Sequence, residues 1–237
     1  MKRTVDILWH ALFSWVSAHG LDISPNLIES SEDLFHRPGR KFLHVGCGAA
    51  RKPDVGPGFL ADEWGEVRLD IDPMASPDIV SSMLDMELVP TASVEAVYSH
   101  HNIEHLYPHE VTVALLEFFR VLKEDGVLVL ACPDLQSLCR LIVDDKLDQP
   151  AYLSSVGPVT PLDVLYGHRP QLAAGNLFMA HHTGFTLRTL VETVCAAGFR
   201  SVAGRRRDAY FDLWIVAAKG HLPEQEMQVL MDIHLPQ

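Results

Sequence analysis

A series of short apolar runs, separated by helix-like or polar segments, constrains the fold more than any other feature of the sequence. Residues 41–46, 66–72, 77–80 and 93–99 each have the pattern of a strand, and residues 126–133 form the most apolar run. An uninterrupted apolar strand is typical of a parallel sheet that is covered on both faces. Crossovers of this length between strands predict right-handed connections. We therefore predict an α/β fold around a parallel sheet.

Two segments have the apolar spacing of amphipathic helices. Residues 109–126 predict one helix, and Gly126 is expected to close it in a left-handed cap before the most apolar strand. Residues 186–197 predict a second helix, which ends before Gly198. Residues 199–220 contain two further strand patterns joined by a short polar turn, so we expect an antiparallel pair at this end of the domain.

Three parts of the chain are expected. Residues 1–40 are predicted to form an N-terminal helical segment, residues 41–219 the α/β domain, and residues 220–237 a C-terminal tail. Within the domain, residues 134–183 begin with a weak helix pattern and continue without a clear period. Because long excursions of this kind in compact domains are usually lids or binding loops, we interpret residues 134–183 as an insertion that builds a substrate pocket.

Composition and charge narrow the class of partner. The chain has 237 residues and a formal net charge of -12 at pH 7, and such an acidic surface would repel a phosphate backbone, so nucleic acid is not expected as a partner. The one basic cluster, residues 205–207, is interpreted as a solvated strand end. No apolar run approaches the length of a membrane span, and none of the four cysteines forms a C-x-x-C pair. We therefore expect a cytoplasmic protein.

A glycine-containing turn, Gly46-Cys47-Gly48, follows the first strand. Two glycines one residue apart let the backbone turn tightly and approach a ligand without a side-chain clash. Asp70 ends the next strand, where a carboxylate can accept hydrogen bonds from both ribose hydroxyls of a nucleotide; Asp72, two residues on, is the alternative. The sequence therefore predicts a nucleotide-like ligand at the carboxyl edge of the sheet.

An NAD(P)-dependent oxidoreductase is one candidate for such a site. Its fingerprint requires a third glycine, and this chain has Arg51 at that position. A Tyr-x-x-x-Lys pair, which many of these enzymes use, is also absent from the sequence. Both departures argue against NAD(P) as the cofactor.

Five runs of the sequence, in order, are similar to the successive motifs of class I S-adenosylmethionine (SAM)-dependent methyltransferases: HVGCG, RLDIDP, LDMELVP, VEAVYSHHNIEHL and FFRVLKEDGVLVLACPD. The chain resembles the small-molecule, type 11-like group of that family over residues 41–219. The resemblance implies a Rossmann-like, mostly parallel, seven-stranded sheet with helices on both faces and a C-terminal antiparallel strand. It also implies that SAM is the cofactor. A methyl group would move to an oxygen or nitrogen of a small-molecule acceptor such as a sugar, a lipid or a secondary metabolite.

The resemblance also implies roles for individual residues. The glycine turn would pass under the methionine part of SAM, Asp70 would hold the ribose, and Asp85 with Met86 would contact the adenine. The end of the fourth strand would lie beside the sulfonium. The expected cofactor-binding residues are Gly46, Cys47, Gly48, Asp70, Ile71, Asp85, Met86, Ser99 and His100. The family often has an acidic residue where this chain has His44, which leaves a non-catalytic SAM-binding protein open as an alternative.

The sequence holds thirteen histidines, and three positions match a metal-binding motif. His101, Glu104 and His105 form H-x-x-E-H, the inverted motif of one group of zinc proteases. A protease context is missing, because the motif directly follows an apolar strand of a small parallel sheet. We therefore expect no metal ion, and we expect Glu104 and His105 to begin the next helix and to fix the loop by hydrogen bonds.

Two histidines are candidates for a catalytic base. A neutral imidazole of His182 or His101 could take the proton from a hydroxyl or amine acceptor as the methyl group moves. The expected substrate contacts are Tyr166, His168, Arg169 and His181. The expected partner is a small-molecule acceptor, and the sequence leaves a homodimer open.

Overall fold

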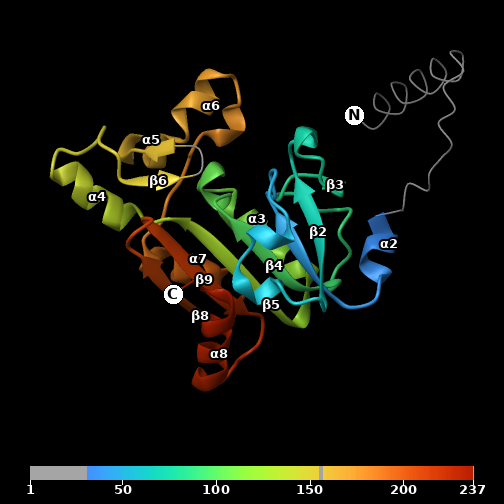
Figure 1. Ribbon diagram of the computed structural model, residues 1–237. Coiled ribbons are helices and arrows are strands. Elements are labelled where there is room, and N and C mark those ends of the chain that lie inside the picture. The colour runs from blue at the N-terminus through green and yellow to red at the C-terminus, as the bar shows by residue number, and fades with distance from the viewer. Residues whose placement is uncertain (1–30, 155–156, 237) are drawn as a thin grey trace, which may run out of the picture. The chain divides into compact units, whose positions relative to one another are not determined.

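The computed structural model describes residues 31–154 and 157–236, so most of the expected N-terminal helical segment, residues 1–40, lies outside the described residues. A seven-stranded sheet with the order β3-β2-β1-β4-β5-β9-β8 forms the centre of this part (Figure 1). Strands β1 to β5 run parallel, and β9 is antiparallel to both of its neighbours. The strands are β1 (Arg40–Val45), β2 (Trp64–Asp70), β3 (Ile79–Val80), β4 (Val94–His100), β5 (Leu122–Pro133), β8 (Ser201–Arg207) and β9 (Asp212–Ala218). The predicted fold class is confirmed.

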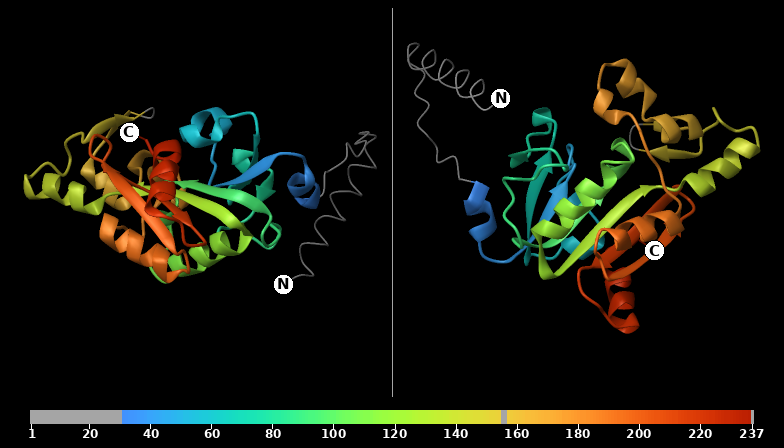
Figure 2. Two further views of the ribbon diagram at one scale, coloured as in Figure 1. Left: turned by 90° about the horizontal axis from the view of Figure 1, so that it is seen from below. Right: turned by 180° about the vertical axis from the view of Figure 1, so that it is seen from behind.

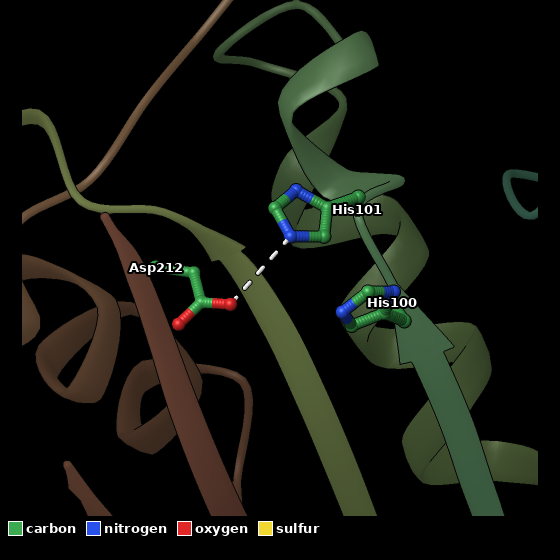
Figure 3. A group of neighbouring side chains, drawn as sticks. All are labelled: His100, His101 and Asp212. Atoms are coloured by element: carbon green, nitrogen blue, oxygen red, sulfur yellow. Dashed lines mark ion pairs between the residues drawn. The ribbon is translucent and has the colours of Figure 1, made fainter. Parts of the chain in front are cut away.

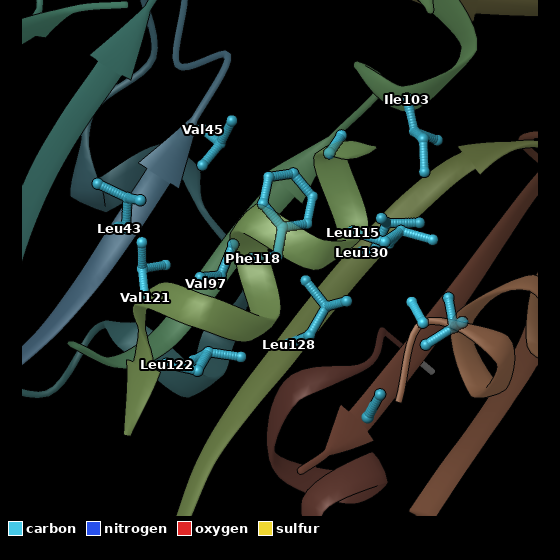
Figure 4. Close-up of a cluster of buried hydrophobic side chains, with 14 of the residues drawn as sticks. Leu43, Val45, Val97, Ile103, Leu115, Phe118, Val121, Leu122, Leu128 and Leu130 are labelled. Atoms are coloured by element: carbon cyan, nitrogen blue, oxygen red, sulfur yellow. The ribbon is translucent and has the colours of Figure 1, made fainter. Parts of the chain in front are cut away.

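Helices cover both faces of the sheet, as the left view of Figure 2 shows. Helices α3 (Val111–Val121) and α7 (Leu187–Ala196) lie on one face, above a cluster of fully buried aliphatic side chains around Phe118 (Figure 4). Helix α8 (Glu224–His234) lies on the other face together with the short 3-10 helix η2 (Pro57–Phe59). The central strands are covered on both sides, so their sequences lack the regular alternation of apolar and polar residues that a half-exposed strand shows.

The second face of the sheet has an aromatic core. The rings of Phe42 and Phe59 stack with their centroids 4.6 Å apart, and Trp64 meets the Phe59 ring edge-on at 5.1 Å. Tyr98 adds a further edge contact to Phe59 at 5.7 Å. Ring pairs in these geometries add about 0.5–1.5 kcal/mol each beyond their buried area.

One predicted helix boundary is wrong and the other is confirmed. Helix α3 ends at Val121, and Gly126 lies inside β5 rather than in a left-handed cap. The reason is that Leu122 already pairs with Val94 of β4, which keeps the chain extended. Helix α7 ends as expected before Gly198, whose φ of +109° is left-handed.

The segment from residue 134 to residue 183 is folded into short elements. Figure 1 shows α4, α5 and α6 grouped beyond the end of β5. The elements are α4 (Leu135–Val143), β6 (Tyr152–Ser154), β7 (Gly157–Val159), α5 (Pro161–Tyr166), α6 (Arg169–Ala173) and the 3-10 helix η5 (Leu177–Met179). Strands β6 and β7 form a small antiparallel pair apart from the main sheet. This segment covers the edge of the sheet at which parallel strands present ligand sites.

The remaining described helices are short. They are α2 (Ser31–His36) and the 3-10 helices η1 (Lys52–Asp54), η3 (Pro73–Ala75) and η4 (Ile103–His105). In residues 31–154 and 157–236, none of the helices combines the length and the apolar character that crossing a membrane would require.

Candidate active site

A cavity of about 590 Å³ opens at the carboxyl ends of β1, β2 and β4. Gly46, Gly48, Asp70 and His100 line its floor, and residues of α6 and η5 line the opposite wall. The volume lies within the range of about 300–1,000 Å³ that is usual for small-molecule sites. Parallel strands commonly hold nucleotides in this position.

The glycine turn leaves room for a ligand close to the backbone. Gly46 has a φ of +64°, and a Cβ at this position would overlap the side-chain amide of Asn102. Gly48 has a φ of +50°, and no described atom lies within 4 Å of the place that its Cβ would take. Since Gly48 lines the cavity, the space above it belongs to the ligand site. The turn therefore fits a cofactor that passes over the backbone.

Asp70 presents a carboxylate to the same cavity. Its side chain is largely buried, and Oδ2 accepts a 2.7 Å hydrogen bond from the Gly48 backbone N–H, while Oδ1 accepts one of 2.8 Å from the Asp72 N–H. Each oxygen keeps a further lone pair for a hydroxyl donor. Asp72 also lines the cavity, but its Oδ1 caps η3 by accepting from the Met74 N–H at 2.8 Å. This geometry favours Asp70 for a ribose.

Among the nine expected cofactor-binding residues, five line this cavity: Gly46, Gly48, Asp70, Ile71 and His100. The other four do not, namely Cys47, Asp85, Met86 and Ser99. Met86 is fully buried in the core beside α3, so its side chain cannot pack on a ring in the cavity. Ser81, Ser82 and Met83 line the wall at that place instead.

Cys47, Ser99 and Asp85 fail to reach the cavity for local reasons. The side chains of Cys47 and Ser99 are buried beneath the turn. Asp85 is exposed, its backbone bridges to Ser82, and its backbone oxygen accepts a 2.6 Å hydrogen bond from the Ser81 hydroxyl. His44 likewise points away from the ligand site, because its Nδ1 lies 2.7 Å from Glu66 Oε1 and its ring contacts Tyr98.

A smaller cavity of about 270 Å³ adjoins the first. The two cavities share His101, His105, Gln171 and Met179 in their walls. The rest of the smaller cavity is lined mainly by residues of the 134–183 segment and by the turn between β8 and β9. Two sites that share a wall can hold two molecules in contact.

Two of the four expected substrate contacts, His168 and His181, line the smaller cavity. Tyr166 and Arg169 do not. Tyr166 is 62% exposed on α5. Arg169 is engaged elsewhere, because its Nε lies 2.6 Å from Asp163 Oδ1, and Asp163 caps the start of α5. The structure therefore gives Arg169 a role in holding α5.

His101 lies between the buried carboxylates of Glu104 and Asp212, and Figure 3 shows it with Asp212. Its Nδ1 is 3.2 Å from Glu104 Oε1, and its Nε2 is 3.9 Å from Asp212 Oδ2. Burial alone would lower the pKa of His101, but the nearby carboxylates of Asp212 and Glu104 raise it to about 9. His101 is therefore an imidazolium at neutral pH and has no lone pair with which to accept a proton. Burial lowers the pKa of the neighbouring His100 to about 3, so His100 is neutral.

His182 lies on the wall of the larger cavity with an exposed ring. The ring stacks on Tyr107, with the centroids 4.2 Å apart and the planes at 17°. The His182 backbone N–H donates a 2.8 Å hydrogen bond to the Glu104 carbonyl oxygen, which fixes the chain at this point. Of the two expected bases, His182 is the one whose ring is free of carboxylate partners among the described residues.

The sequence analysis missed several residues of the site. Asn102 lines the larger cavity, and its Nδ2 donates to the carbonyl oxygens of Val45 at 2.9 Å and His100 at 3.0 Å, which ties β1 to β4. Its position directly after a strand was a usable signal. Gln171, Asn176 and Phe178 also line the cavity, but they lie in short elements that have no periodic pattern.

A family model described as a methyltransferase domain matches residues 7–130, which is more than half of the chain. No curated protein matches the chain. The family match, together with Arg51 at the position of the third glycine, decides against the NAD(P) alternative.

Solved structures are similar to the chain at low sequence identity. The CMeT domain of citrinin polyketide synthase is 11% identical with a TM-score of 0.50, over 78% of this chain and 47% of that chain. A SAM-dependent methyltransferase from Archaeoglobus fulgidus is 16% identical with a TM-score of 0.49, over 81% and 96%. The 1,6-didemethyltoxoflavin-N1-methyltransferase of Burkholderia thailandensis is 16% identical with a TM-score of 0.47, over 91% and 88%. The likeness to the CMeT domain concerns the fold alone.

The sheet order, the bare backbone at Gly48 and the carboxylate of Asp70 agree with the family that the sequence match identifies. The chain therefore belongs to the SAM-dependent methyltransferase family, and SAM is its cofactor.

Proposed function

We propose that this methyltransferase moves the methyl group of SAM to an oxygen or nitrogen of a small molecule bound in the smaller cavity. The observation that carries the proposal is the shared wall of the two cavities, formed by His101, His105, Gln171 and Met179. An acceptor in the smaller cavity would meet a cofactor in the larger one at this wall. Residues of the 134–183 segment form much of the wall of the smaller cavity, which supports the interpretation of this segment as a substrate-pocket insertion.

The larger cavity offers suitable groups for each part of the cofactor. The backbone of Gly46 and Gly48 would accommodate the methionine part, and Asp70 would accept hydrogen bonds from the ribose hydroxyls. The half-exposed Ile71 and the Met83 side chain provide apolar surface for a base. When it is bound, SAM supplies a methyl group that is already activated by its sulfonium.

The protein then contributes mainly positioning and the handling of one proton. The acceptor atom attacks the methyl carbon in line, the carbon–sulfur bond breaks, and S-adenosylhomocysteine leaves. For a hydroxyl or protonated amine acceptor, we assign the base to His182, because its ring lines the cavity and carries no carboxylate partner in the described residues. His101, held as an imidazolium by Glu104 and Asp212, stabilises the loop after β4.

Binding of the cofactor is tested by calorimetry of the full chain with S-adenosylhomocysteine and, separately, with NAD. Asp70→Asn removes the charge that would hold the ribose, so its affinity for S-adenosylhomocysteine should fall at least about tenfold, or about 1.4 kcal/mol. The matched variant Asp72→Asn should bind within about threefold of the wild type, since Asp72 is engaged as a cap. Equal losses in the two variants, or tight binding of NAD instead, would contradict the assignment.

Methyl transfer is tested with isotopically labelled SAM and a panel of small hydroxyl and amine acceptors. With an accepted hydroxyl compound, His182→Asn should lower turnover by about 10²-fold or more, as expected when a general base is lost. Its affinity for S-adenosylhomocysteine should stay close to that of the wild type. Unchanged turnover in His182→Asn would show that His182 is not the base. Failure to form a labelled product with every acceptor class would contradict the proposed reaction.

A further inference from the structure

Three potential metal ligands from two distant parts of the chain meet at the smaller cavity. Glu104 and His105 lie in η4, directly after β4, and His181 lies before α7. One ligand atom of each residue lies within 4.8 Å of the other two. All three side chains line the smaller cavity, and His105 also lines the larger one.

The two imidazoles are fixed in the orientation that metal ligands require. His105 Nδ1 lies 3.1 Å from the Ala180 carbonyl oxygen, and His181 Nδ1 lies 2.7 Å from the Val164 carbonyl oxygen. A carbonyl oxygen can only accept, so each Nδ1 carries the proton and donates it. In the neutral ring, Nε2 then keeps its lone pair. Metal-ligating histidines are typically oriented by such a bond from the other ring nitrogen.

The two imidazoles also lie close to each other at the wall of the smaller cavity. The rings of His105 and His181 lie with their centroids 4.8 Å apart at 69°, which brings the two side chains together without stacking them.

Glu104 supplies a buried carboxylate with a spare oxygen. The side chain is 1% exposed, and Oε1 is 3.2 Å from His101 Nδ1. Oε2 is buried without a hydrogen-bond partner in the part of the chain that the structure describes. A buried carboxylate oxygen without a hydrogen-bond partner is unfavourable, and a metal ion bound to Oε2 would supply the missing partner.

We propose that Glu104, His105 and His181 bind one divalent first-row transition-metal ion, with its open positions facing the smaller cavity. Two imidazoles and one carboxylate suit Zn²⁺, Co²⁺ or Mn²⁺, whereas Mg²⁺ and Ca²⁺ prefer oxygen ligands throughout. This inference departs from the expectation from the sequence that no metal is bound. Two residues of the H-x-x-E-H motif, Glu104 and His105, are therefore ligands. His181 takes the place of His101 as the third ligand.

A second group of potential ligands, His100, His101 and Asp212, is less suitable. The Asp212 carboxylate already pairs with Arg207, whose Nη2 lies 2.5 Å from Oδ2. His101 Nδ1 lies 3.2 Å from Glu104 Oε1, and its Nε2 faces Asp212. An ion bound by this group would therefore compete with existing ion pairs of Asp212 and His101.

The role of the ion rests on the proposed function, although its binding does not. The site lies beside the wall that the two cavities share, so a hydroxyl acceptor could coordinate the ion and lose its proton more readily, as metal-bound water does. The proton would pass to His182, the oxygen would form the bond to the methyl carbon, and the carbon–sulfur bond would break to release S-adenosylhomocysteine. The ion would thereby select acceptors that carry a coordinating oxygen.

The proposal is tested on the full chain after treatment with a chelator, by calorimetric titration with Zn²⁺ and by the visible absorption of added Co²⁺. We expect one tightly bound ion per chain. His105→Ala, His181→Ala and Glu104→Gln should each weaken its binding at least about tenfold. His109→Ala is the matched control, because His109 is an exposed histidine of the same loop that lies outside the cluster. It should bind the ion like the wild type.

Two further measurements separate loss of the site from other failures. Circular dichroism and S-adenosylhomocysteine affinity report the fold and the cofactor site, and both should be retained in His181→Ala, whose side chain does not line the larger cavity. Absence of stoichiometric binding by Zn²⁺ and Co²⁺, or full binding in both histidine variants, would overturn the metal site. Loss of methyl transfer with intact metal binding would instead count against the proposed function alone.

Discussion

Gly46 and Gly48 belong to one turn, and both have positive φ angles. The space beside each residue is nevertheless used differently. At Gly46 the protein itself fills the space, since a Cβ would overlap the Asn102 amide that ties β1 to β4. At Gly48 the space is open and forms part of the ligand cavity. The first glycine therefore serves the fold, and the second serves the ligand.

This difference predicts that alanine affects mainly stability at Gly46 and also ligand affinity at Gly48. Gly46→Ala should lower the free energy of unfolding by about 1–3 kcal/mol, because it adds a steric overlap to an unfavourable φ. Gly48→Ala should cost only about 1–2 kcal/mol for the left-handed backbone, but its methyl group should lower the affinity for S-adenosylhomocysteine about tenfold or more. Urea unfolding and calorimetry measure the two effects, and wild-type affinity in Gly48→Ala would show that the cofactor does not pass over this residue.

Site residues at strand ends could be predicted from the sequence, and most others could not. Gly46, Asp70 and His100 line the cavity as expected because the carboxyl ends of parallel strands meet at one edge of the sheet. Met86 did not follow from the same reasoning, since it lies one residue beyond a bridge and its side chain turns into the core. Glu104, one partner of His101, lies three residues away in the H-x-x-E-H motif, but the other, Asp212, comes from β9, and no local pattern links it to His101.

At the scale of elements, long periodic segments were predictable and short ones were not. Helix α7 has ten residues, a Thr186 side chain that caps its first turn, and a glycine after its end, so its sequence specifies both boundaries. Helices α5 and α6 have six and five residues, and β6 and β7 have three each. Elements of that length do not complete enough periods to be recognised, and their positions depend on contacts with the main sheet.

The same short elements determine what the smaller cavity can bind. Asp163 caps α5 and holds Arg169 at the start of α6, which fixes the loop that carries His168. The His181 Nδ1 bond to the Val164 carbonyl oxygen joins α5 to the chain before α7. Because these links run through side chains of the segment itself, the acceptor pocket is built independently of the glycine turn.

At the scale of the whole molecule, the ligand site lies at the carboxyl edge of the sheet, and the aromatic core lies on the face that α8 covers. His234 ends α8, is 4% exposed, and packs against Phe59 with the ring centroids 4.8 Å apart. Burial, with a smaller effect of Arg40, lowers the pKa of His234 to about 4. Its Nδ1 has no hydrogen-bond partner in the described part of the chain. The folded molecule therefore holds this ring in its neutral form.

Acid should destabilise the protein through His234. In the unfolded chain His234 has an ordinary pKa of about 6.5, so between that value and about 4 the unfolded state binds a proton that the folded state does not. Stability is therefore lost as the pH falls through this window, by up to about 2 kcal/mol from this group between pH 7 and pH 5. His234→Phe should reduce the fall in unfolding free energy by about 1–2 kcal/mol over the same interval.

Urea unfolding at pH 7 and pH 5 measures this difference in the wild type, His234→Phe and the control His221→Phe, which changes an exposed histidine before the same helix. The control should show the same fall as the wild type. Affinity for S-adenosylhomocysteine at pH 7 should be unchanged in His234→Phe, because the ring does not line the cofactor cavity. An equal fall in all three proteins would mean that the acid sensitivity arises from other buried groups, of which His100, with its pKa lowered to about 3, is the next to test.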